Sequence, residues 1–96
     1  MICLAVTYTV KPGTEAEAEQ HLRSLIAPSR AEPGCRMYVV HRSTEDPRTF
    51  FLYEQYDDQT ALDSHLASPH FEQHGRYGVR RLAESRVAVT CTPFGD

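Results

Sequence analysis

The 96-residue chain lacks several features that would place it in a large class of proteins. It has no apolar run near the roughly 20 residues that cross a membrane, so we expect no membrane partner. It has no excess of basic residues: the net charge of −3 argues against nucleic acid, since phosphate binding needs a basic surface. Its first ten residues have neither the basic lead nor the cleavage site of a signal peptide, which favours a cytoplasmic location.

Cysteine is also scarce. Cys3, Cys35 and Cys91 are odd in number and form no CxxC pair, which excludes a disulfide framework and a zinc knuckle. We therefore expect buried, reduced thiols. The composition, 41% hydrophobic and 24% charged, is that of a globular protein, and the length predicts a single domain over residues 1–96.

The order of secondary structure follows from hydrophobic periodicity. Alternating residues predict strands over 2–10, 35–42 and 49–56, and a fourth strand around Val87 to Cys91. A helix follows Thr14 and should kink or end at Pro28, while one or two more helices lie between residues 57 and 82. This order predicts an α+β fold of the ferredoxin-like split βαβ type, a four-stranded antiparallel sheet with helices on one face.

Such a sheet leaves its second face open to solvent. In this chain that face carries large apolar side chains, namely Met37, Val39, Phe51 and Tyr53. Exposed apolar surface of this kind is normally covered, and a second copy of the chain covers it most simply. We therefore expect a homodimer formed through the open sheet face.

Residues 49–71 hold the strongest candidate for a functional site. Glu54 shares a strand face with Phe50 and Leu52, and His65 lies at the edge of an apolar helical stripe. Ionisable groups among apolar neighbours are costly unless something satisfies them. Glu54 is thus either a general base, or a carboxylate that orients a histidine, or a structural carboxylate. His65 is either the acid/base group or a histidine bonded to Glu54 for architecture alone.

Most of the chain resembles the antibiotic-biosynthesis monooxygenase (ABM) family, which includes quinol monooxygenases. The residues that carry the resemblance are Glu32-Pro33-Gly34-Cys35, Tyr38, Arg42, Phe50, Leu52, Glu54, Tyr56, Ala61, His65, Ser68, Pro69, His70 and Phe71. It implies a dimeric α+β barrel of ferredoxin-like subunits, with an apolar pocket between sheet and helices. Characterised members oxidise phenols or quinols with O2 and use no metal or flavin.

The chain departs from part of this family because it contains no asparagine and no tryptophan. Haem-cleaving members and an aromatic-polyketide oxygenase resemble one another in using both residues. Tyr56 occupies the usual tryptophan position here. The departure argues against haem degradation and against the polyketide type of mechanism.

Our leading interpretation is a cofactor-independent monooxygenase that oxidises a quinol or polyphenolic aromatic with O2. Glu54 and His65 would be catalytic, and the substrate would bind against Tyr38, Tyr56, His70 and Phe71. The alternatives are a non-catalytic dimeric protein that binds a small molecule in the same pocket, and a structural dimerisation module.

The remaining histidines allow one further interpretation. His70 and His74 have the i, i+4 spacing that can clamp a metal, with Glu72 or Glu54 to complete the site. No third ligand has motif spacing, so we expect no metal. We expect His21 to be solvated.

Overall fold

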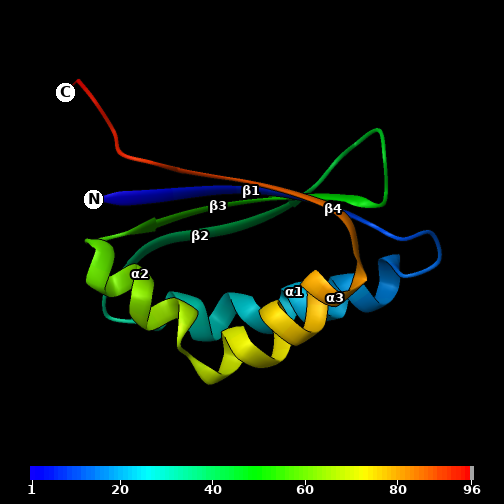
Figure 1. Cartoon of the computed structure of the whole chain (residues 1–96), viewed down its shortest axis with the longest axis horizontal. Helices are drawn as coiled ribbons and strands as arrows, with labels where there is room; N and C mark the ends of the chain where they lie inside the picture. Colours follow the sequence, from blue (N-terminus) through cyan, green and yellow to red (C-terminus); the bar gives the residue numbers. More distant parts are fainter. Residues whose placement is uncertain (96) are drawn as a thin grey trace.

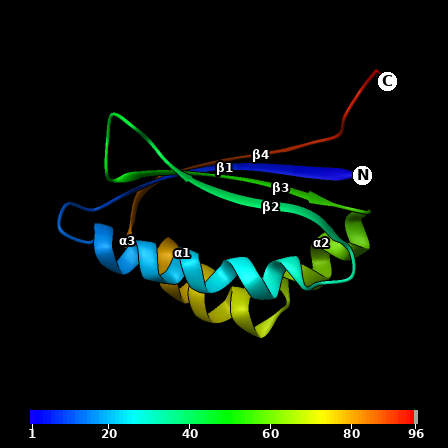
Figure 2. The same cartoon turned by 180° about the vertical axis from the view of Figure 1, so that it is seen from behind.

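A computed structural model describes residues 1–95 of the chain. Its elements in chain order are β1 (Ile2–Val10), α1 (Glu15–Arg30), β2 (Cys35–Arg42), β3 (Thr49–Tyr56), α2 (Gln59–Leu66), η1 (Phe71–Val79), α3 (Arg80–Leu82) and β4 (Ala83–Cys91). The four strands form one sheet in the order β2-β3-β1-β4, and every neighbouring pair is antiparallel. All helices lie against the same face of this sheet (Figures 1 and 2). The predicted ferredoxin-like α+β fold is confirmed.

The covered face of the sheet follows the period-two pattern of the strands. On β3, Phe50, Leu52, Glu54 and Tyr56 are all buried, whereas Phe51 on the opposite face is exposed. The helix α1 lays Leu22 and Leu25 onto this face, and they belong with Phe50 and Leu52 to the hydrophobic core. Glu54 is therefore a carboxylate on the core-facing side of a central strand.

Pro28 does not end the first helix. The helix continues to Arg30, because Pro28 lies in its last turn and removes only one backbone hydrogen bond there. The helix thus extends two residues beyond Pro28, and the turn that follows it carries Glu32, a residue of the candidate site.

The opposite face of the sheet is uncovered in the single chain. Its large apolar side chains are exposed at Met37, Phe51, Val87 and Val89. The thiol of Cys91 is exposed as well, so the expectation of buried cysteines holds for Cys3 but is wrong for Cys91. In residues 1–95, none of the helices combines the length and the apolar character needed to cross a membrane.

Candidate functional site

The candidate site forms where α2 and η1 meet. Asp58 caps α2 by accepting a hydrogen bond from the Ala61 backbone N–H, 2.9 Å away. At the other end of α2, the Ser68 hydroxyl donates to the His65 carbonyl at 2.7 Å and accepts from the Phe71 N–H at 3.2 Å. This serine ties the end of one helix to the start of the next, and so places His65, His70 and Phe71 close together.

A close contact between the turn after α1 and the helix α2 brings Glu32 to the site. Gly34 lies directly against α2: a Cβ at this position would come within 2.4 Å of the Ala61 Cβ. The Gly34 carbonyl also accepts from the Asp57 N–H at 2.9 Å. Only glycine allows this approach, and it positions Glu32, two residues earlier, beside α2.

His65 lies at the centre of the site and is 1% exposed. Four rings surround its imidazole, with ring centroids 5.2 to 6.0 Å away, and they belong to Tyr38, Tyr56, His70 and Phe71. These are the four residues that the sequence placed around the substrate. The structure therefore brings all six predicted site residues together.

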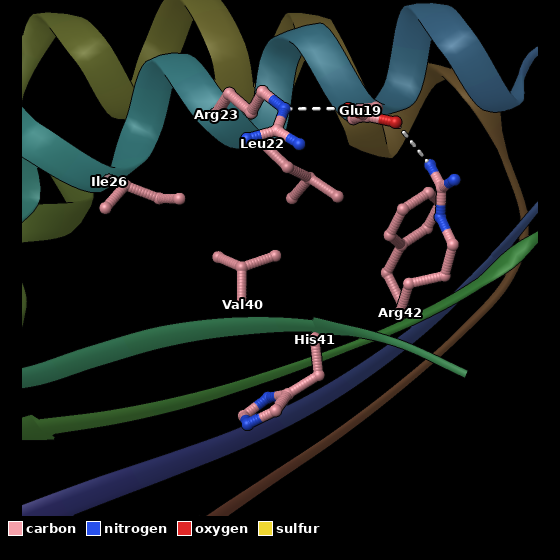
Figure 3. Close-up of a pocket in the computed structure, with 8 residues that line it drawn as sticks. Glu19, Leu22, Arg23, Ile26, Val40, His41 and Arg42 are labelled. Carbon is pink, nitrogen blue, oxygen red and sulfur yellow. Dashed lines mark hydrogen bonds and ion pairs between the residues drawn. The ribbon is translucent and has the colours of Figure 1, made fainter. Parts of the chain in front are cut away.

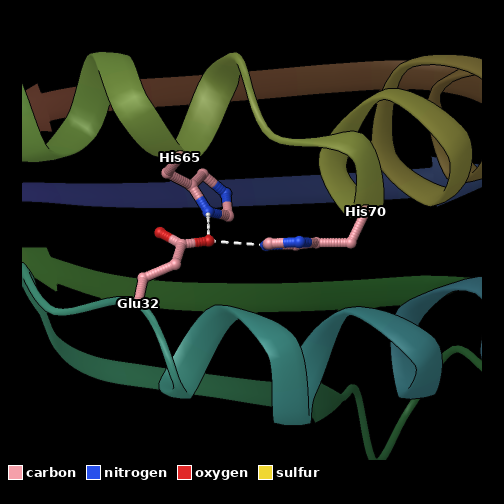
Figure 4. Close-up of side chains that lie close together, drawn as sticks. All are labelled: Glu32, His65 and His70. Carbon is pink, nitrogen blue, oxygen red and sulfur yellow. Dashed lines mark hydrogen bonds and ion pairs between the residues drawn. The ribbon is translucent and has the colours of Figure 1, made fainter.

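The carboxylate of Glu32 binds both histidines through a single oxygen (Figure 4). Its Oε2 lies 2.8 Å from Nδ1 of His65 and 2.6 Å from Nε2 of His70. A carboxylate can only accept hydrogen bonds, so each histidine donates an N–H to it. In neutral His65 the proton is thus on Nδ1, and the lone pair is on Nε2.

The second carboxylate, Glu54, faces the other nitrogen of His65. Its Oε1 accepts a hydrogen bond of 2.6 Å from the Tyr56 hydroxyl and lies 3.7 Å from Nε2 of His65. The latter distance is too long for a direct hydrogen bond. The hypothesis that Glu54 orients His65 through a hydrogen bond is therefore wrong, because Glu32 fills that role.

Burial changes the proton affinity of each group in the site. It raises the pKa of Glu54 to about 7, an effect that the Tyr56 hydrogen bond opposes and the charge of Glu32 strengthens. Burial also lowers the pKa of His65, although Glu32 favours its charged form. The pKa values of Tyr38 and Tyr56 are raised, chiefly by burial. At neutral pH the site thus holds a neutral imidazole beside a carboxyl group that is readily protonated.

The hollow at this site is small. A cavity of about 20 Å³ lies between sheet and helices, and its lining includes Glu54, His65 and Phe71. This volume holds roughly one water molecule, whereas pockets for small ligands measure about 300 Å³ or more. The sequence predicted an apolar pocket large enough for a flat ring between sheet and helices, and the cavity found there is too small for one. A ring can enter only if side chains move.

A larger groove lies elsewhere, between α1 and β2 (Figure 3). It encloses about 240 Å³, and its floor is apolar, with Leu22, Ile26, Val40 and Phe50. Its charged groups are already paired, since Glu19 bonds Arg23 at 2.7 Å and Arg42 at 2.8 Å. Figure 3 shows His41 pointing away from this groove. No free acid or base faces it among the residues that line it.

Known proteins share both the sequence pattern and the fold. The profile of the antibiotic biosynthesis monooxygenase family matches residues 1–77, which include all six predicted site residues. The chain belongs to this family. A Mycobacterium tuberculosis protein named "Putative monooxygenase Rv0793" is 34% identical over 89 residues, 93% of this chain and 86% of that protein. The Bacillus subtilis protein named "Putative monooxygenase YcnE" is 32% identical over 72 residues, 75% of this chain and 76% of that protein.

Solved structures agree with this family assignment. The crystal structure of PA3566 from Pseudomonas aeruginosa superposes with a TM-score of 0.90 at 34% identity, over 98% of this chain and 94% of that one. The structure of Rv0793 superposes with the same TM-score at 27% identity, over 99% and 96%. The monooxygenase family and the ferredoxin-like fold are thus supported by sequence and by structure.

Sequence reasoning missed Glu32 as part of this ABM site. It lies in a turn and, unlike Glu54, does not stand in an apolar strand, so hydrophobic periodicity does not mark it. The one available signal was its place in the Glu32-Pro33-Gly34-Cys35 motif that carries the family resemblance. Sequence reasoning was also wrong about His21, which was expected to be solvated. His21 contacts His74 instead, Nδ1 to Nδ1 at 3.0 Å.

Proposed function

We propose that this protein is a monooxygenase that oxidises a quinol or polyphenolic aromatic with O2, without a cofactor. The observation that carries the proposal is the arrangement at His65. Its Nδ1 is held by Glu32 at 2.8 Å, so its Nε2 lone pair points toward the cavity and Glu54. A carboxylate that orients an imidazole in this way creates a general base.

The first step in this scheme is proton removal. Nε2 of His65 takes the proton of a substrate hydroxyl, and the Glu32 carboxylate stabilises the imidazolium that forms. The electron-rich anion can then pass an electron to O2 itself, so the protein need only supply a base and a dry site. For a quinol, one oxygen atom enters the ring and the product is the hydroxyquinone. The substrate itself supplies the four electrons that reduce O2 and the two protons with which the other oxygen atom leaves as water.

Glu54 is the proposed proton donor. With a pKa of about 7 it is protonated in a large fraction of molecules at neutral pH, and the Tyr56 hydroxyl supports it from one side. A neutral carboxyl group can donate to the oxygen that gains negative charge. Glu54 and His65 thus divide the acid and base roles because their environments move their pKa values in opposite directions.

Substrate entry in this proposal requires Phe71 to move. Its ring packs on Gly75 so closely that a Cβ there would lie 2.7 Å from it. Phe71 therefore occupies the volume that a substrate ring needs next to His65. The segment that carries it is a π-helix, a geometry often found at functional sites.

We further propose that two copies of the chain pair through the open sheet face. The exposed side chains of Met37, Phe51, Val87 and Val89 provide the apolar surface for such an interface. Replacing Phe51 by Glu should convert the dimer to a monomer in sedimentation velocity. A wild-type protein that sediments as a monomer would contradict this part of the proposal.

The catalytic proposal is tested by oxygen uptake with a panel of hydroquinones. Wild-type protein should consume O2 in their presence, and His65→Gln should lose most of this activity while keeping its circular dichroism spectrum. Parallel thermal-shift measurements separate the alternatives. If a hydroquinone stabilises the protein but no oxygen is consumed, the protein is the non-catalytic binder. If hydroquinones neither stabilise the protein nor cause oxygen uptake, only the dimerisation module remains.

A further inference from the structure

We propose that Glu32, His65 and His70 form a binding site for one divalent transition-metal ion, of which Zn²⁺ is the representative. The three residues come from the turn after α1, from α2 and from the start of the helix that contains η1 (Figure 4). Their ligand atoms, Oε2 of Glu32, Nδ1 of His65 and Nε2 of His70, all lie within 4.8 Å of one another. The site shares Glu32 and His65 with the proposed general base, so a bound ion would take the place of the hydrogen bond from His65 Nδ1 to Glu32. Metal binding can be measured without the oxygenase reaction.

The distances are close to those of a bound ion. Zn²⁺ binds imidazole nitrogen and carboxylate oxygen at about 2.0 to 2.2 Å, so two ligand atoms on a tetrahedral ion lie about 3.4 Å apart. Glu32 Oε2 now lies 2.8 and 2.6 Å from the two nitrogens. An ion that replaces the two bridging protons must therefore lengthen both distances by less than 1 Å. The two nitrogens, which lie within 4.8 Å of each other, must come to about 3.4 Å as well.

The ligand chemistry suits a borderline metal rather than a hard one. Two imidazoles and one carboxylate form a set that binds zinc, iron and cobalt, whereas magnesium and calcium prefer oxygen alone. Three protein ligands leave a fourth position for water, as in open metal sites. The single carboxylate offsets part of the ion's charge.

The surroundings would hold the ligands in place and still admit an ion. His65 is 1% exposed, and the rings of Tyr38, Tyr56 and Phe71 pack around its imidazole and hold it in place. Glu32 and His70 have side chains 16% and 19% exposed, so the cluster opens to solvent on one side. An ion can enter there without unfolding of the core.

One other histidine pair could compete for the same ion. His21 and His74 lie 3.0 Å apart, and Glu17 lies 3.7 Å from His21. That pair sits between α1 and η1 and shares no residue with the proposed site. It therefore provides a matched control within the same chain.

The experiment is a titration of the purified protein, freed of metal by a chelator, with Co²⁺ and then Zn²⁺. Isothermal titration should give one site per chain, and Co²⁺ should develop a visible d–d spectrum that Zn²⁺ displaces. The variants are Glu32→Gln and His70→Gln, with His74→Gln as the control. Glu32→Gln keeps the size of the side chain and its ability to accept a hydrogen bond. The unfolding temperature of each metal-free variant checks its folding.

Loss of a ligand should weaken Co²⁺ binding by at least about tenfold in Glu32→Gln and His70→Gln, and His74→Gln should bind as the wild type does. The metal should raise the unfolding temperature of wild-type protein and of the control, but not of the two ligand variants. The proposal is overturned if the wild type gives no Co²⁺ spectrum. It is equally overturned if binding survives in His70→Gln or disappears in His74→Gln. All these readouts are independent of oxygen uptake.

Discussion

The cavity at His65 and the groove between α1 and β2 differ in size and in chemistry. The groove is about twelve times larger in volume, with about 240 Å³ against about 20 Å³. Its ionisable side chains are partly exposed and already joined in ion pairs, such as Glu19 with Arg23 and Arg42. The small cavity instead faces a carboxyl group and an imidazole that are almost fully buried, Glu54 and His65.

The difference teaches that volume alone does not identify a site in this protein. In the groove, the hydrogen bond and charge of Arg23, with the charge of Arg42, lower the pKa of Glu19 and favour its charged form. Burial favours the neutral forms of Glu54 and His65. Groups that can exchange protons near neutral pH are the ones that catalysis uses.

The largest expected effect distinguishes the two regions by activity. His65→Gln should lower the rate of quinol-dependent oxygen uptake by about 10²- to 10⁴-fold, because it removes the general base. Arg42→Ala, in the groove, should leave the rate within about twofold of wild type. An unchanged rate in His65→Gln, or a large loss in Arg42→Ala, would move the active site to the groove.

Two buried phenylalanines give the next comparison. Phe71→Ala, at the cavity, and Phe50→Ala, at the groove, should each lower the free energy of unfolding by about 3 to 5 kcal/mol in urea denaturation. Only Phe71→Ala makes room beside His65, so only this variant should bind bulky hydroquinones more tightly, as measured by KM. Equal effects of both variants on KM would show that Phe71 does not restrict entry.

The pH dependence of stability tests the environment of Glu54. Its pKa is about 7 in the folded protein and near the ordinary glutamate value of 4.5 when unfolded, so the folded state binds the proton more tightly. The contribution of Glu54 to the free energy of unfolding is fully present below about pH 4.5 and is lost as pH rises through about 7. Wild-type protein should therefore lose about 3 kcal/mol relative to Glu54→Gln over this interval.

Urea denaturation of both proteins at several pH values measures this difference. His65 acts in the opposite direction, because its lowered pKa makes the protein less stable as pH falls. This contribution is present in both proteins, so it cancels when the free energy of unfolding of Glu54→Gln is subtracted from that of the wild type. A difference that does not vary with pH would mean that Glu54 is not held neutral by burial.

The smallest effect is expected at the groove surface. Arg23 is 73% exposed, and its ion pair with Glu19 is screened by water and salt. Arg23→Ala should therefore leave the unfolding midpoint unchanged within error. A clear decrease in the midpoint at low salt would indicate that the Glu19 pairs contribute more than exposed ion pairs usually do.

Local pattern was sufficient for the fold and for the buried positions of Glu54 and His65 in the candidate site. The alternation in β3 puts Glu54 on the same face as Phe50 and Leu52, and the helical stripe of α2 puts His65 on the buried side. Both patterns involve only residues that are close together in the sequence, so they can be recognised without the structure. Glu32 could not be found in this way, since its contacts are with residues 33 and 38 positions further along the chain.

The amino-acid sequence by itself determined the strands, the helices and the faces on which Glu54, His65 and the aromatic side chains lie, because side-chain direction repeats with the backbone period. Only the tertiary structure decided which acid holds His65 and how little space remains beside it. Those outcomes depend on the contact between Gly34 and Ala61 and on the packing of Phe71 against Gly75. Such contacts between separate elements leave no periodic signal in the chain.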